Sequence, residues 1–168
     1  WVMGLLAIVA ILIVFTLPYA KPKKYYSLSI AAFREVLNPK LLRLDFSAFS
    51  LHMILSSGFI VMPLLIVEYN IINMFDNWQL YLPAILLSFI GMLPLIILSE
   101  KYKKTKPILV FCIALLILSQ GMFYALNLNF SMFLIILTIF FVAFNSIEAI
   151  LPSLLSRTAS TSKRGLAV

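Results

Sequence analysis

Glu148 has the clearest potential for chemistry in this sequence, because this acid follows a long uncharged segment. The thirteen residues before Asn145, "MFLIILTIFFVAF", carry no charge, and Arg157 comes nine residues after Glu148. Asn145, Glu148 and Pro152 are spaced at i, i+3 and i+7, which places them on one face of a helix. A carboxylate that faces lipid inside a membrane costs about 2.5–3.5 kcal/mol or more. We therefore expect Glu148 to face protein or water.

Three roles for Glu148 are open: a structural hydrogen bond, coupling to a proton, or contact with a cationic substrate. No lysine or arginine falls within a predicted membrane span. The partner of Glu148 is therefore a lysine of segment 101–106 that reaches inward, a group outside this chain, or a proton bound by the carboxylate itself. Gln120 and His52 are weaker candidates. We expect His52 to lie at the membrane interface rather than to relay protons.

The remaining reactive side chains form no recognisable catalytic or metal-binding motif. Cys112 is the single cysteine, so an internal disulfide is excluded, and its apolar surroundings indicate a packing role. The single histidine has no H-E-x-x-H context, and the sequence has no G-x-G-x-x-G, phosphate loop or G-x-S-x-G motif. We expect no metal, no cofactor and no enzymatic activity.

The composition indicates whether water or lipid surrounds the chain. Hydrophobic residues make up 63% and charged residues 11% of the 168 residues, and the mean hydropathy is +1.09. In a soluble domain, about a quarter of the residues are charged. This chain cannot cover itself with a hydrated surface, so the lipid bilayer must surround most of it.

Five uninterrupted apolar segments are long enough to cross a bilayer as helices. About 20 helical residues span roughly 30 Å of hydrocarbon, whereas strands of a membrane barrel would be about half as long and would alternate polar and apolar residues. The sequence therefore predicts an all-α polytopic membrane helix bundle. The predicted spans are residues 1–20, 47–68, 78–99, 107–126 and 131–156.

All 13 basic residues fall in alternate connections between these spans. Loops rich in lysine and arginine remain in the cytoplasm, so we predict that residues 21–46, 100–107 and 157–165 are cytoplasmic. The net charge of +7 then reflects membrane orientation rather than nucleic-acid binding. The basic residues are Lys21, Lys23, Lys24, Arg34, Lys40 and Arg43, then Lys101, Lys103, Lys104 and Lys106, and finally Arg157, Lys163 and Arg164.

The segment 21–46 is predicted to be an amphipathic cytoplasmic linker. Ile30, Phe33 and Leu37 share a helical face in "SIAAFREVL", which favours a short amphipathic helix. Asn38-Pro39 would end this helix and cap the next one, a lead-in to span 47–68. A simple basic tether near lipid phosphates is an equally good interpretation of the linker.

Small and helix-bending residues lie within the predicted spans. Ser88-x-x-Gly91 forms a small face that permits the close approach of a partner helix. Proline is tolerated in membrane helices because neighbouring groups satisfy the freed carbonyls. The prolines in or near spans are Pro63, Pro83, Pro94 and Pro152, and the aromatic residues expected at the outer interface are Tyr69, Trp78, Tyr81 and Tyr124.

Two stretches carry a more specific pattern: "GMLPLIILSEKYKKTKP" and "NSIEAILPSLLSRTASTSKRGLA". Both resemble the major facilitator superfamily, and within it the YajR-type bacterial inner-membrane transporters. The first is similar to the loop between the eighth and ninth helices, a partial copy of an acid-plus-basic signature between helices two and three. Glu100 and Lys101 correspond to its acid–base pair and Lys103, Lys104 and Lys106 to its basic end, whereas its glycines are absent.

The second stretch is similar to the tenth helix and its loop into the eleventh. It matches through Glu148 to Leu154 and through Arg164-Gly165. The resemblance and the polar residues together give two sets of candidates. Those for transport or coupling are Glu148, Asn145 and Gln120, and those for the structure or gating of the family signatures are Glu100, Lys101, Lys104, Pro152, Arg164 and Gly165.

The resemblance also implies a domain organisation. Residues 1–20 correspond to the sixth helix, 21–46 to the linker, and 47–168 to helices seven to ten and the start of the eleventh. The chain opens on Trp1 without an initiator methionine, so we expect an internal piece of a longer protein. Its expected partner is then the N-terminal half of six helices.

The function predicted from the sequence is secondary active transport, with export of a small molecule by alternating access and coupling to protons or another ion. The expected location is the bacterial inner membrane. A non-transporting membrane scaffold or assembly factor is the alternative, and it would lack an internal six-helix repeat. A membrane-bound enzyme would need more reactive groups than one histidine and one buried acid.

Overall fold

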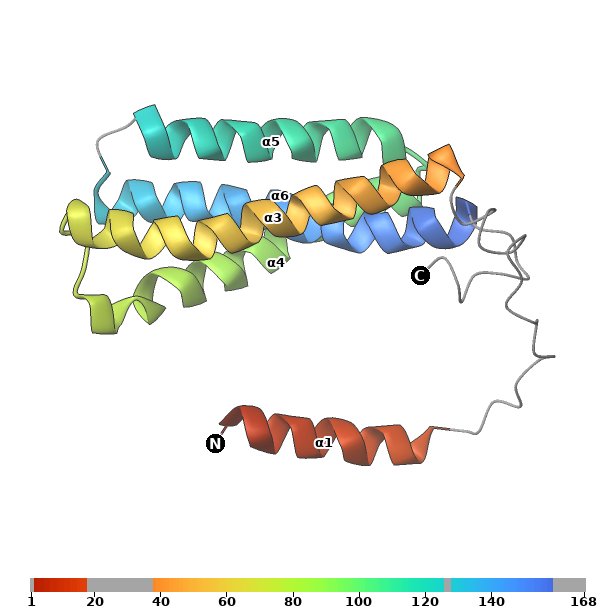
Figure 1. Cartoon of the computed structure of the whole chain (residues 1–168), viewed down its shortest axis with the longest axis horizontal. Coiled ribbons are helices and arrows are strands. Elements are labelled where there is room, and N and C mark those ends of the chain that lie inside the picture. Colours follow the sequence, from red (N-terminus) through yellow and green to blue (C-terminus); the bar gives the residue numbers. More distant parts are fainter. Residues whose placement is uncertain (1, 18–37, 126–127, 159–168) are drawn as a thin grey trace. The chain divides into compact units, whose positions relative to one another are not determined.

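The computed structural model describes residues 2–17, 38–125 and 128–158, and each regular element in these ranges is a helix. The chain divides into two units, residues 1–30 and residues 31–168. The first unit contains α1 (Val2–Thr16). The second contains α3 (Pro39–Glu68), the short 3-10 helix η1 (Met74–Asp76), α4 (Trp78–Glu100), α5 (Thr105–Ala125) and α6 (Phe130–Thr158), as Figure 1 shows.

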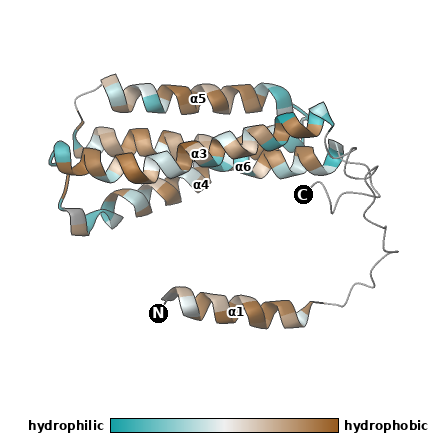
Figure 2. Ribbon diagram, viewed as in Figure 1, coloured by the Kyte–Doolittle hydropathy of each residue, from teal (hydrophilic) through white to brown (hydrophobic). Residues whose placement is uncertain are grey.

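Four helices of the second unit are long and apolar enough to cross a membrane: α3, α4, α5 and α6. Their central turns carry apolar residues and their ends carry polar ones (Figure 2). These helices correspond to four of the five predicted spans, so the prediction of an all-α membrane helix bundle is confirmed. Within the fifth, residues 1–20, the structure describes α1, an apolar helix of 15 residues.

The start of α3 differs from the predicted span boundary. The side chain of Asn38 accepts a hydrogen bond of 3.0 Å from the backbone N–H of Lys40, and Pro39 occupies the first turn. Both features favour helix initiation. Residues 39–46, which the sequence analysis placed in the linker, therefore belong to a continuous helix of 30 residues. At about 1.5 Å per residue this helix is roughly 45 Å long, more than the hydrocarbon thickness.

Helix α6 is the centre of the second unit. Half of the residues in its most apolar segment are buried, compared with 17–22% for α3, α4 and α5. It packs against all three of these helices. The fully buried side chains of α6 include Phe133, Ile136, Leu137 and Phe140. The outer faces of α3, α4 and α5 instead expose large apolar side chains, as expected of surfaces that meet lipid or further helices.

The connection between α4 and α5 is short. Lys103 adopts a positive φ of 56°, which lets the chain reverse between Glu100 and Thr105. The turn is held by a 3.2 Å hydrogen bond from Thr105 Oγ1 to the carbonyl of Ser99. Because this turn is tight, α4 and α5 are antiparallel neighbours.

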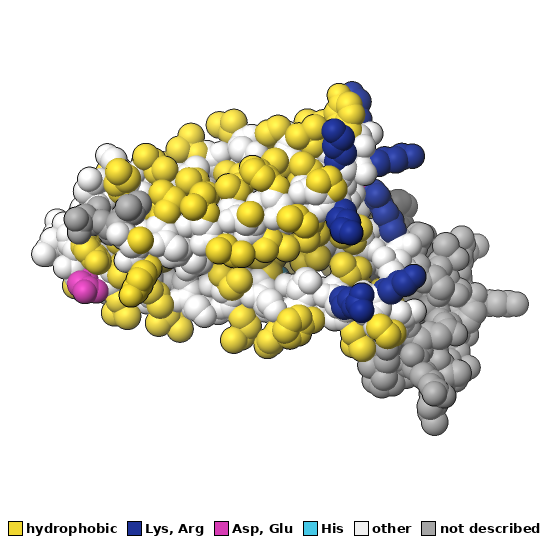
Figure 3. Space-filling model, turned by 90° about the horizontal axis from the view of Figure 1, so that it is seen from above, with side chains coloured by type: hydrophobic (Ala, Val, Ile, Leu, Met, Phe, Trp, Pro, Cys, Tyr) yellow, Lys and Arg dark blue, Asp and Glu magenta, His cyan; other side chains and the backbone are white. Residues whose placement is uncertain are grey.

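Basic side chains gather at one end of the second unit, which we call the basic end (Figure 3). The tight turn between α4 and α5, the start of α3 and the last turn of α6 all contribute to it. The exposed aromatic residues Tyr69, Phe75, Trp78 and Tyr124 lie near the opposite ends of the same helices. The described members of the basic end are Lys40, Arg43, Lys101, Lys103, Lys104, Lys106 and Arg157.

Several predictions fall on residues outside the described ranges. They concern the amphipathic helix of the linker and the candidate residues Arg164 and Gly165.

Candidate functional site

Helix α6 presents two different stripes to its neighbours. Val142, Asn145 and Ser153 contact α4. Phe144 and Glu148 lie beside His52 of α3. The two stripes follow from the helical repeat, since residues separated by three or four positions lie on one side.

The contact between α4 and α6 is close in the middle of the helices. A Cβ atom added at Gly91 would lie 2.7 Å from Cγ2 of Val142, so this position has no room for a side chain. One turn away, the amide Nδ2 of Asn145 donates a 2.9 Å hydrogen bond to Oγ of Ser88. The Ser88-x-x-Gly91 face therefore packs against α6, as its spacing predicts.

Glu148 and His52 form a pair between α6 and α3. Nε2 of His52 lies 4.0 Å from Oε1 of Glu148. The other ring nitrogen, Nδ1, lies 3.0 Å from the backbone carbonyl of Ala48, and the ring edge packs beside Phe144 at a centroid distance of 6.2 Å. Because a carbonyl only accepts hydrogen bonds, Nδ1 carries a proton in this geometry, and Nε2 is directed to the carboxylate.

Both members of this pair are accessible within the second unit. The His52 side chain is 60% exposed and that of Glu148 is 50% exposed. The other helices of this unit therefore leave the pair uncovered. Among the described residues, no group of three or more His, Cys, Asp or Glu side chains is close enough to hold a metal ion.

This pairing was not predicted from the sequence, in which the expected partner of Glu148 was a lysine of segment 101–106, a group outside the chain or a bound proton. His52 was expected at the membrane interface. In the structure α3 begins at Pro39, so His52 lies about 20 Å along the helix at 1.5 Å per residue. The Asn38-Pro39 cap was predicted from the sequence, but the pairing of His52 with Glu148 depends on how α3 packs against α6.

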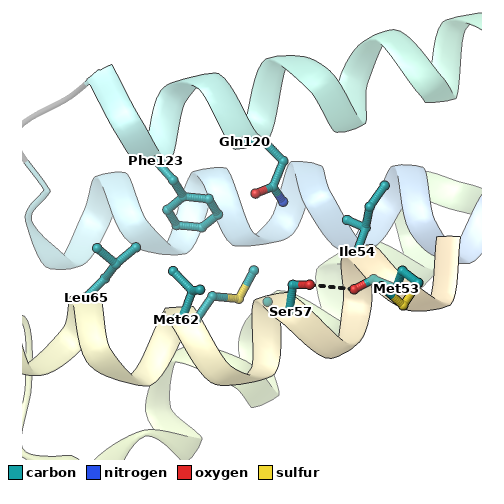
Figure 4. Close-up of a pocket in the computed structure, with 9 residues that line it drawn as sticks. Met53, Ile54, Ser57, Met62, Leu65, Gln120 and Phe123 are labelled. Carbon is teal, nitrogen blue, oxygen red and sulfur yellow. Dashed lines mark hydrogen bonds between the residues drawn. The ribbon is translucent and has the colours of Figure 1, made fainter. Parts of the chain in front are cut away.

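Asn145 and Gln120 do not join Glu148. Asn145 is half-buried and bonded to Ser88, on the side of α6 that faces α4. Gln120 extends from α5 toward α3 (Figure 4). The three transport candidates therefore lie in three different places: Glu148 beside His52, Asn145 against Ser88, and Gln120 between α5 and α3.

Gln120 lines two cavities between α3 and α5, with volumes of about 260 and 410 Å³. Their walls are mainly apolar, and Ile147 of α6 contributes to the larger one. The smaller is lined by Met53, Ile54, Ser57, Gly58, Val61, Met62, Leu65, Gln120 and Phe123 (Figure 4).

A second polar cluster joins α4 to α6 at the basic end. Glu100 accepts hydrogen bonds from Ser153 Oγ at 2.9 Å and from the guanidinium of Arg157, with which it forms an ion pair. Lys101, expected beside Glu100 as its basic counterpart, instead has its Nζ atom 6.0 Å from the centre of the Tyr102 ring. Lys104 is exposed in the turn. Ser153 and Arg157 were not predicted as partners of Glu100, because they lie on a helix that is distant from Glu100 in the chain.

Pro152 lies inside α6, one turn after Glu148. Proline has no N–H, so the backbone carbonyl of Glu148 cannot accept the usual helical hydrogen bond from position 152. Glu148 thus has both a side-chain carboxylate and a backbone carbonyl that lacks its usual helical hydrogen bond. Pro63 in α3 and Pro83 and Pro94 in α4 also lie inside helices.

Comparisons with known proteins agree with the resemblance described above. The sequence pattern of the Major Facilitator Superfamily matches residues 1–168. The chain is 33% identical to the inner membrane transport protein YajR of Escherichia coli (strain K12) over 138 residues. This aligned region makes up 82% of this chain and 30% of YajR. The chain is also 33% identical to the uncharacterized transporter BU466 of Buchnera aphidicola subsp. Acyrthosiphon pisum (strain APS) over 172 residues. This alignment covers 98% of this chain and 44% of BU466.

The chain spans less than half the length of each of these two relatives. The family match nevertheless extends over all of its residues, and four of the described helices are long and apolar enough to cross a membrane. The chain belongs to the Major Facilitator Superfamily.

Proposed function

We propose that the intact protein is a secondary active transporter in which the His52–Glu148 pair binds and releases a coupling proton. The observation that carries this proposal is the 4.0 Å approach of these two exposed side chains between two membrane helices. Titratable groups inside membrane spans are costly and mark ion or substrate pathways in transporters. Family membership and the names of the two relatives support transport as the activity.

The chemistry of the pair supports proton coupling. With Nδ1 bonded to the Ala48 carbonyl, Nε2 and the carboxylate share one proton, either as imidazolium and carboxylate or as imidazole and carboxylic acid. Both forms have no net charge. Loss of that proton leaves a net negative charge between α3 and α6, which weakens their contact. Proton binding therefore favours one packing of the two helices over another.

The charge distribution supports an orientation in the membrane. We assign the basic end to the cytoplasm, since lysine-rich and arginine-rich ends remain there. With this orientation α3 and α5 run outward and α4 and α6 run inward. In the intact protein this bundle faces a second half across a central pathway, and alternating access moves a small molecule out of the cell. The proposed location is the bacterial inner membrane.

The basic end supports a structural role for the family signatures. Glu100 holds the last turn of α6 through Ser153 and Arg157, so the inner ends of α4 and α6 move together. Lys101 and Lys104 belong to the cytoplasmic surface at which the two halves separate and close, and the family resemblance adds Arg164 and Gly165 as gating candidates. Pro152 interrupts the hydrogen bonding of α6 between this end and Glu148, so the helix can bend there.

The central test is to replace Glu148 with glutamine in the full-length protein, together with a reporter cysteine at Ala149. Ala149 is exposed next to Glu148, so its labelling reports access to the pair. A membrane-impermeant maleimide is applied from either side of membrane vesicles, between about pH 5 and about pH 8, where histidine side chains ordinarily change charge. We expect labelling from both sides in a ratio that changes with pH, and a ratio independent of pH in Glu148→Gln.

Asp76→Asn is the matched control, because it removes a carboxylate at the end opposite the basic end. It should leave the pH dependence unchanged. Labelling from one side at every pH, in the parent and in both variants, would favour a non-transporting scaffold. A pH-dependent ratio that persists in Glu148→Gln would retain alternating access but exclude Glu148 as the coupling residue.

A further inference from the structure

The direction in which Glu148 points depends on the rotation of α6 about its own axis. Its carboxylate is half exposed, and among the described side chains His52 is its one charged partner. The side chain is therefore not held in place by surrounding packing. The rotation of α6 therefore sets which distances from His52 the carboxylate of Glu148 can reach.

The contact of Asn145 with Ser88 is suited to fix this rotation. Ser88 is completely buried, and its hydroxyl donates a 2.7 Å hydrogen bond to the carbonyl of Ile85 while it accepts one from Asn145 Nδ2. The hydroxyl hydrogen is already used in the bond to Ile85, so Ser88 Oγ acts toward α6 as a hydrogen-bond acceptor. Such interhelical hydrogen bonds are a main source of helix association in membranes, where no hydrophobic effect acts between helices.

Gly91 and Val142 restrict the same rotation sterically. The close approach at Gly91 places the Val142 side chain directly against the α4 backbone. Val142 and Asn145 are separated by three residues, so both lie on the α4-facing stripe of α6. Rotation in either direction would break the hydrogen bond, and it would also move Val142 away from the only position where α4 lacks a side chain on this face.

The geometry of a helix links this contact to Glu148. Residue 148 follows residue 145 by three positions, or about 60° around the axis at 3.6 residues per turn. The side-chain envelope of a helix has a radius of about 5 Å, so a rotation of about 20° moves an atom at this radius by roughly 2 Å. When the rotation carries Glu148 away from His52, this displacement lengthens the separation of 4.0 Å and breaks the contact.

We propose that Asn145 and Ser88 are positioning residues for Glu148: their hydrogen bond sets the rotation of α6 that keeps the carboxylate beside His52. Neither residue binds the proton. The consequence for pH dependence rests on the proposed function, whereas the positioning itself is a property of the fold.

The first experiment measures geometry without any transport assay. Cysteines replace His52 and Glu148 in the full-length protein, and the rate of oxidative cross-linking in the membrane is compared with and without Ser88→Ala or Asn145→Ala. Either substitution should slow cross-linking by about threefold or more, as expected from the loss of one interhelical hydrogen bond. The combination should have no larger effect than either alone, because both remove the same bond.

Thr138→Val is the matched control for this experiment. Thr138 is also a half-buried polar residue of α6, but its hydroxyl bonds to the Leu134 carbonyl within the same helix. Cross-linking should proceed at the parental rate in this variant. The exchange Ser88→Asn with Asn145→Ser keeps both polar groups and nearly the same volume, and it should recover part of the lost rate.

The second experiment uses the native His52 and Glu148 with the reporter cysteine at position 149. Ser88→Ala and Asn145→Ala should shift the pH at which the labelling ratio changes, both in the same direction, whereas Thr138→Val should not. Unchanged cross-linking rates and an unchanged pH profile in these variants would overturn the proposal. If Glu148→Gln alone had no effect on the pH profile, the proposed coupling would fail, and cross-linking would still decide whether Asn145 positions residue 148.

Discussion

Glu100 at the end of α4 and Arg157 at the end of α6 form an ion pair that joins the two helices at the basic end. Ser153 donates a second hydrogen bond to the same carboxylate. Glu100 and Arg157 are 36% and 54% exposed, so solvent and salt screen the charge component of the pair. The serine bond is not subject to this screening to the same degree.

Removal of either charge should therefore destabilise the full-length protein modestly, by up to about 1 kcal/mol, and less at high salt. Glu100→Gln, Arg157→Gln and their combination form a double-mutant cycle, measured by thermal unfolding in detergent. The charge reversal Glu100→Arg with Arg157→Glu should recover the coupling. Ser153→Ala should lower stability by a similar amount at low and at high salt. A coupling energy of zero at low salt would show that the two helix ends are held together by other contacts.

Gly91 should be intolerant of a side chain. An alanine there would bring Cβ to 2.7 Å from Val142, so α4 and α6 must separate or Val142 must change its rotamer. Overpacking of this kind costs about 1–3 kcal/mol, and thermal unfolding of the full-length protein in detergent measures the loss. Gly121→Ala is the control, because a Cβ at that helical position meets no atom within 4 Å in the described part of the chain. Equal stabilities for the two variants would contradict the close approach of α4 and α6.

His52 should determine how access near Glu148 depends on pH. On the proposed function, loss of the shared proton leaves a net negative charge between α3 and α6, so the contact should loosen and labelling of a cysteine at Ala149 should become faster. His52→Gln removes the imidazole ring. The labelling rate, divided at each pH by that of a free thiol to remove the ordinary increase in thiolate fraction, should then vary little between about pH 5 and about pH 8. Phe49→Leu, an exposed position on the same helix, serves as the control. An unchanged pH profile in His52→Gln would assign the effect to another group.

The orientation of the chain makes a prediction that includes residues outside the described ranges. Single cysteines at Lys23 and Lys103 should be labelled by an impermeant reagent from the cytoplasmic side, and cysteines at Phe75 and Tyr124 from the opposite side. Cys112 is completely buried, and its replacement by alanine removes background labelling. Reaction of Lys23→Cys and Lys103→Cys from opposite sides would contradict the predicted topology.

The positions of the membrane helices could be predicted from the sequence because each depends on local properties. The apolar runs around residues 78–99 and 131–156 differ from α4 and α6 by no more than two residues at either end, since the bilayer selects helices by length and hydropathy. The cap formed by Asn38 and the small face of Ser88-x-x-Gly91 were also readable, because both are patterns of nearby residues.

The partners of the polar side chains were decided by the tertiary structure. Glu148 was identified as the acid that needs a partner, but His52, Ser88 as the partner of Asn145, and Arg157 as the partner of Glu100 appeared only when the helices were packed. Each of these contacts depends on how far two helices are displaced along their axes and how each is rotated. Those quantities are fixed by side chains from distant segments packing together, such as Val142 against Gly91 and Leu155 against Leu41. The sequence by itself determined which segments enter the membrane, whereas the packing of α3, α4 and α6 determined which of their polar groups meet.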